Sequence, residues 1–76
     1  MNESQTRIEL IEALRALSDT SGDLRIGQLI AGVGELCADL HGRGLWDASD
    51  SELLEAVWQF HRNLEASAAH IGGNGV

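Results

Sequence analysis

Cysteine is almost absent from this sequence, since Cys37 is the single one among 76 residues. One cysteine excludes a disulfide within the chain, and the paired spacings typical of zinc sites, such as Cys-x-x-Cys, do not occur. The sequence also lacks the apolar segment of a secretory signal and the apolar run of about 18 residues that a membrane-spanning helix needs. We therefore expect no membrane association and a cytoplasmic location.

Positive charge is scarce as well. Lysine is absent, and the five cationic residues, all arginines, stand against twelve acidic ones, which gives a formal net charge of −7. Because the acidic residues are spread along the chain, they disfavour contact with the phosphate backbone of nucleic acids and with anionic membranes. The composition predicts no nucleic-acid partner and favours a protein partner with a basic or mixed surface.

Recognisable catalytic patterns are also missing. The sequence contains no glycine-rich phosphate loop, no paired nucleophile and base, and no complete set of metal ligands. Cys37 and His41 lie four residues apart on one helix face, which is half of a metal site, and a buried structural cysteine explains Cys37 without a metal. We expect that the chain is not an enzyme and binds no metal or cofactor.

Helical periodicity covers most of the chain, and no strand-like alternation exceeds four residues. Apolar residues spaced three and four apart predict helices over about 4–18, 25–41 and 50–67. Asp23 is the predicted N-cap of the second helix, Gly42 its predicted end, and Ser49 with Glu52 a capping box for the third. The sequence thus predicts an all-α fold, a small three-helix antiparallel bundle in one domain over 1–68, with a flexible, disordered Gly-rich tail over 69–76.

The segment 25–41 is apolar on nearly every side, so we expect it to be the central, buried helix of the bundle. Its small residues Gly27, Ala31 and Gly34 lie along one flank and predict the close approach of another backbone. The alternative is a bend or break at 32–34, because glycine is a poor helix former. The other two helices offer little apolar surface to cover this one, so we expect a homodimer or a larger partner.

Polar residues at the starts of the second and third helices allow two interpretations. Arg25, one turn before Gln28, is expected to form an ion pair with Asp47 or Asp50, and the alternative is a role in binding a small ligand. Ser51 follows Asp50 and so resembles the Asp-Ser attachment point of acyl carrier proteins. Helix capping explains the same residues without an attached group.

Two tryptophans are the candidate anchors for a partner. Trp46 lies in an extended connection between Gly44 and Asp47, which favours an exposed position, whereas Trp58 is expected to close the bundle from the third helix. Tryptophan is common both at the edges of cores and at the hot spots of interfaces. Core-edge packing is the alternative to an interface role for both side chains.

The run Asp23-Leu-Arg-Ile-Gly-Gln-Leu-Ile30, followed by Leu45-Trp-Asp47 and Asp50-Ser-Glu-Leu-Leu54, resembles a group of short uncharacterised bacterial helical proteins. The resemblance implies the same helical layout and brings no activity with it. From the residues themselves we expect a small non-enzymatic protein–protein interaction module: an adaptor, a regulator or an accessory subunit. A homodimer is one form that such a module can take. The alternative is an acyl-carrier-like or ligand-binding helical module that uses Ser51 or Arg25.

Overall fold

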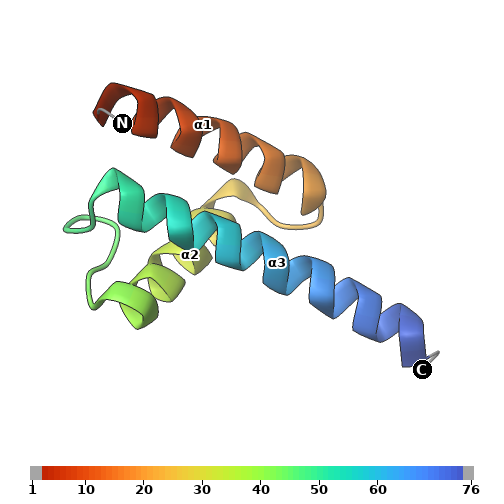
Figure 1. Ribbon diagram of the computed structural model, residues 1–76. Helices are drawn as coiled ribbons and strands as arrows, with labels where there is room; N and C mark the ends of the chain where they lie inside the picture. Colours follow the sequence, from red (N-terminus) through yellow and green to blue (C-terminus); the bar gives the residue numbers. More distant parts are fainter. Residues whose placement is uncertain (1–2, 75–76) are drawn as a thin grey trace.

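The computed structural model describes the backbone of residues 3–74 and the side chains of residues 4–66. Over this part the chain forms three helices and no strand: α1 (Glu3–Thr20), α2 (Ile26–His41) and α3 (Asp50–Asn74) (Figure 1). The prediction of an all-α three-helix bundle is confirmed. None of the helices within residues 3–74 combines the length and the apolar character needed to cross a membrane.

α3 was expected to end near residue 67, but its helical backbone continues to Asn74. The side chains of residues 67–76 lie outside the described part of the chain, as does the backbone of residues 75–76. The expected disorder over 69–76 therefore stays a prediction.

The middle position in the bundle belongs to α3, because both other helices pack against it and make few contacts with each other. α1 and α3 run in the same direction: Arg7 near the start of α1 pairs with Asp50, and Thr20 at its end reaches His61 (Figure 1). The expectation that the second helix is central is wrong. α2 is apolar on many sides, but α3 covers only one of its faces, so α2 lies at the side of the bundle.

α2 packs antiparallel to α3 and leaves part of its apolar surface exposed. Gly32 lies against the ring of Phe60, and Arg43, just beyond the end of α2, pairs with Glu52 near the start of α3. Ile26 and Leu40, at the two ends of α2, are 63% and 47% exposed. The surplus of apolar surface that the sequence predicted for this helix is therefore real.

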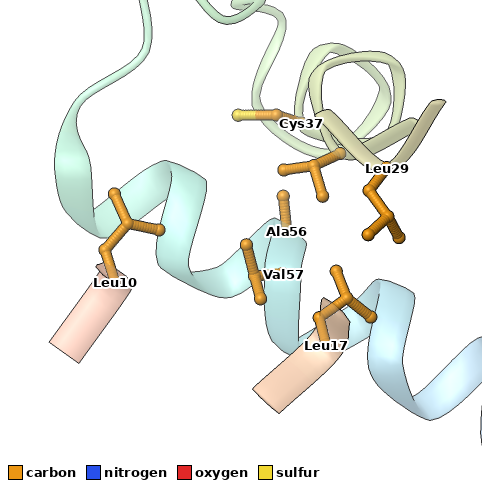
Figure 2. Close-up of a cluster of buried hydrophobic side chains, with 7 residues drawn as sticks. Leu10, Leu17, Leu29, Cys37, Ala56 and Val57 are labelled. Carbon is orange, nitrogen blue, oxygen red and sulfur yellow. The ribbon is translucent and has the colours of Figure 1, made fainter. Parts of the chain in front are cut away.

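The hydrophobic core lies where side chains of all three helices meet around Val57, as Figure 2 shows. Its fully buried side chains come from each helix in turn: Leu17 from α1, Leu29, Val33 and Cys37 from α2, and Ala56 and Val57 from α3. Partly buried side chains, among them Leu14, Leu54 and Phe60, cover this centre. Such a small core supplies limited stability, so the connections between the helices matter.

The ends of α2 are fixed by backbone and side-chain hydrogen bonds. Its N-cap is Arg25, not the expected Asp23, because the Gln28 side chain turns back and its Oε1 accepts the Arg25 N–H at 2.9 Å. At the other end Gly42 adopts the left-handed conformation (φ 73°) and donates its N–H to the Ala38 carbonyl at 2.8 Å. Glycine reaches this conformation without strain, so the predicted end of the helix is confirmed.

Candidate functional site

The connection between α2 and α3, residues 42–49, is held at both ends. Arg43 faces Glu52 with two donors: its Nε donates to Oε1 at 3.0 Å, and its Nη2 contacts Oε2. The Ser49 N–H also donates to Glu52 Oε1 at 3.0 Å, and the Glu52 N–H donates to Ser49 Oγ at 3.1 Å. These reciprocal bonds are the capping box that the sequence predicted. Glu52 thereby ties the end of α2 to the start of α3.

The same contacts set the charge state of Glu52. The Arg43 guanidinium, which donates to the carboxylate, is the largest influence, and the backbone N–H of Ser49 adds to it. Together they lower the pKa of Glu52 from 4.5 to about 2. The carboxylate therefore stays ionised through the whole neutral and mildly acidic pH range. Its contacts with Arg43 and Ser49 persist over the same range.

Between these fixed ends lies a tight turn with Trp46 at its apex. The Gly44 carbonyl accepts the N–H groups of Asp47 at 3.2 Å and of Ala48 at 2.9 Å. The residue before Trp46, Leu45, packs its side chain over Gly34, while Ala48 packs against the core. The Trp46 side chain is 95% exposed. A turn whose other members are bonded or packed thus presents an indole almost wholly to water.

Trp58 is exposed to 55% and lies on α3 beside α1. A hollow of about 120 Å³ between the two helices is lined by Ala13 and Ala16 of α1 and by Val57, Trp58 and His61 of α3. We call this hollow the Trp58 groove. Trp58 was expected to close the bundle, and the structure shows it at the edge of the bundle with about half of its surface open.

His61 lines the Trp58 groove and has contacts on both ring nitrogens. Its Nε2 lies 3.1 Å from Thr20 Oγ1 at the end of α1, and its Nδ1 lies 3.4 Å from Glu65 Oε1 one turn further along α3. These contacts join the end of α1 to α3 and fix the ring beside Trp58. Histidine in this place therefore shapes the groove.

The predicted stripe of small residues on α2 is divided by the structure. Gly34 is buried, and a Cβ built there would lie 2.7 Å from Leu45 Cγ, so Gly34 makes room for a side chain of the 42–49 connection. Gly27 and Ala31 are exposed, and nothing lies within 4 Å of a Cβ built on Gly27. Within the described residues no other backbone lies close to Gly27. Its proposed contact with another chain stays a prediction.

Gly32 has a role that the sequence analysis did not assign. A Cβ at this position would lie 2.4 Å from Cε2 of Phe60, so the missing side chain makes space for the aromatic ring of α3. The helix also continues without a break through residues 32–34. The helical pattern placed Gly32 with Gln28 and Glu35 on the face toward water, and this is wrong, because its pairing with Phe60 depends on how α2 and α3 cross.

Arg25 and Gln28 form a helix N-terminus, and the expected ion pair of Arg25 with Asp47 or Asp50 is wrong. Asp50 pairs with Arg7 instead, at 3.5 Å between Oδ2 and Nε. The reason is the length of α2: its 16 residues span about 24 Å at 1.5 Å per residue. This helix separates Arg25 from the connection that carries Asp47.

The remaining candidates have ordinary structural surroundings. Ser51 is exposed, and its hydroxyl oxygen lies 3.3 Å from that of Ser49. Cys37 is buried as expected, and the pKa of its thiol is raised, chiefly by burial and secondarily by the charge of Glu52. His41 differs from them, because its Nε2 is buried and makes no hydrogen bond, although Glu55 Oε2 lies 3.3 Å away. Among the described residues no three His, Cys, Asp or Glu side chains are grouped to hold a metal ion.

Comparisons of the chain with models of protein families, with curated proteins and with solved structures found no match. The resemblance of the segment from Asp23 to Leu54 to short bacterial helical proteins therefore stays a prediction. The surface of the chain has two prominent features, the turn at Trp46 and the Trp58 groove.

Proposed function

We propose that this chain is a small non-enzymatic protein–protein interaction module that works in the cytoplasm as an adaptor, a regulator or an accessory subunit, either with a protein partner or as a homodimer. The observation that carries the proposal is the 95% exposure of Trp46 on a turn that is otherwise held in place. Nucleic acid and membranes are not proposed as partners, because the chain carries a net charge of −7.

The indole of Trp46 is a large apolar surface that the fold leaves in water. A buried tryptophan covers roughly 200 Å², and transfer of that area out of water is worth at most about 5 kcal/mol at 25 cal/mol per Å². The folded chain gains almost none of this transfer free energy from Trp46, because the side chain stays in water. A partner that covers the side chain would gain it, and since Glu52, Arg43 and Gly44 already fix the turn, binding would cost little additional ordering of the backbone.

The acyl-carrier-like or ligand-binding alternative depends on Ser51 and Arg25. The described contacts of both residues belong to helix N-termini: Ser51 beside the capping box of α3, and Arg25 as the N-cap of α2. Mass spectrometry can test directly whether Ser51 carries a covalent group. A covalent group on its hydroxyl would appear as an added mass on the intact 8.2 kDa chain.

The proposal is tested by placing a photo-crosslinking phenylalanine derivative at position 46 in cells of the natural host. We expect one discrete covalent species heavier than 8.2 kDa, whose mass distinguishes a second copy from another protein. The matched control carries the same group at Asp39, which is also exposed but lies on α2. Equal products from both positions, or none from position 46, would contradict the proposal.

A purified Trp46→Ala variant separates a binding role from a structural one. Because Trp46 is 95% exposed, its replacement should change the melting temperature by no more than about 4 °C, since surface substitutions are usually within about 0.5 kcal/mol. The crosslinked or co-purified partner should be lost at the same time. A large fall in melting temperature would mean that Trp46 supports the fold.

A further inference from the structure

The Trp58 groove is a second apolar surface, separate in sequence from the turn at Trp46. Its floor is made of small and apolar side chains, with Ala13 and Ala16 one turn apart on α1 and Val57 on α3. Trp58, 55% exposed, forms one wall. Small residues on one side and an indole on the other leave room for an apolar side chain of another molecule to enter between the helices.

Carboxylates outnumber guanidinium groups around the groove, where Arg15 and Arg62 also lie. Two further hollows border Trp58, and the charged residues that line them are three carboxylates and one guanidinium: Glu9, Glu12 and Glu55, with Arg62. The Arg62 guanidinium donates to Gln59 on its own helix at 2.8 Å. Among the described residues Glu9 and Glu12 take part in no ion pair. The rim of the groove is therefore acidic, and its carboxylates on α1 are available to a cation from outside.

We propose that the Trp58 groove binds a basic amphipathic helix of a partner protein, with an apolar side chain between Ala13, Ala16 and Trp58 and with lysine or arginine residues beside Glu9 and Glu12. Charge complementarity selects this occupant. A second copy of this chain brings a net charge of −7 and the same acidic rim to the contact, which opposes self-association through this surface. The inference extends the proposed function by naming a second surface and the chemistry of what it binds.

The test uses a synthetic amphipathic helix of leucine and lysine, with leucine spaced three and four residues apart, as a labelled probe whose binding is followed by fluorescence anisotropy. We expect binding that weakens as salt is raised. A peptide with glutamate in place of every lysine should not bind. In a Trp46→Phe protein, Trp58 is the single tryptophan, and its emission should shift to shorter wavelength as leucine covers the indole.

Matched variants locate the contact. Trp58→Ala keeps every charge and should weaken binding of the lysine peptide at least tenfold, about the effect of losing a hot-spot side chain. Glu9→Gln combined with Glu12→Gln should weaken it several-fold. Glu35→Gln removes a charge on the solvent face of α2, away from the groove, and should leave the affinity unchanged.

Three results would overturn the inference. Equal binding of the lysine and glutamate peptides would show that charge plays no part. Weakening by Glu35→Gln as large as that by the Glu9→Gln/Glu12→Gln double variant would show a long-range effect of net charge. Sedimentation that shows self-association reversed by Trp58→Ala would identify a second copy as the occupant. Because the crosslinking test at position 46 does not involve this groove, failure of one test leaves the other intact.

Discussion

The glycines of α2 offer a sharp test of the packing, because the same substitution should have different effects at two positions of one helix. Alanine is a better helix former than glycine by about 1 kcal/mol. At Gly27 an added Cβ meets nothing within 4 Å, so Gly27→Ala should raise the free energy of unfolding by up to about 1 kcal/mol. At Gly32 the same Cβ would lie 2.4 Å from Cε2 of Phe60, and the ring must move.

The magnitude follows from the difference between the two variants. The gain in helix propensity is shared, so the difference between Gly27→Ala and Gly32→Ala is mainly the cost of overpacking against the half-buried Phe60 ring, typically 1–3 kcal/mol. For a domain of this size 1 kcal/mol corresponds to about 4–8 °C in melting temperature. We therefore expect Gly32→Ala to melt at least about 4 °C below Gly27→Ala.

The assay is thermal and urea denaturation followed by circular dichroism at 222 nm, with the double variant Gly32→Ala/Phe60→Leu as a control. Leucine lacks Cε2 and Cζ, the two ring atoms that come closest to Gly32, so alanine at position 32 should become less harmful in that background. Equal melting temperatures for Gly27→Ala and Gly32→Ala, or a stabilising Gly32→Ala, would refute the packing of α2 on α3 described above.

Three further predictions concern the connection, the cap and the thiol. The pKa of Glu52 is lower in the folded chain than its ordinary 4.5, so the unfolded chain takes up the proton first and this contribution to stability, present above about pH 4.5, is lost as pH falls toward 2. Glu52→Gln should therefore flatten the acid limb of the stability curve, and an unchanged limb would remove Glu52 as its cause. Ser49→Ala should lower the free energy of unfolding by about 1 kcal/mol through loss of the cap while Ser51→Ala changes it little in the same urea titration; equal effects would mean that Ser49 is not the cap. Cys37, which is fully buried, should react with a thiol reagent in urea and hardly at all in buffer, and rapid reaction in buffer would show that the core opens.

The features that the sequence predicted best are local ones. The capping box of Ser49 and Glu52 and the end of α2 at Gly42 depend on residues within a few positions of one another, and both are present. The N-cap of α2 was placed two residues early, because Ser21 continues the end of α1 and accepts the Leu24 N–H at 3.0 Å. An aspartate before a helix commonly indicates an N-cap. Here the side chain of Gln28, inside the helix, bonds the Arg25 N–H instead.

The features that the sequence did not predict depend on how helices cross. The high apolar content of α2 suggested a central position, yet α3 is central because it uses two sides, with Phe60 toward α2 and His61 toward α1. The ion pair between Arg43 and Glu52 likewise joins residues that lie at the ends of two different helices. The exposure of Trp46 was predicted from its place in the connection, but the extended backbone expected there is wrong, because the N–H groups of Asp47 and Ala48 bond back to the Gly44 carbonyl and form a turn. The Trp58 groove needed the position of α1.

The arrangement of the helices has a mechanical consequence. Because α1 and α2 both pack on α3 and hardly touch each other, α3 is the principal rigid link between them over the described residues. A displacement of α1 by a molecule in the Trp58 groove would reach the turn that carries Trp46 chiefly along the body of α3, whose first residues hold that turn through Glu52. The two surfaces thus share α3 as their support, so a movement of this helix would shift both of them.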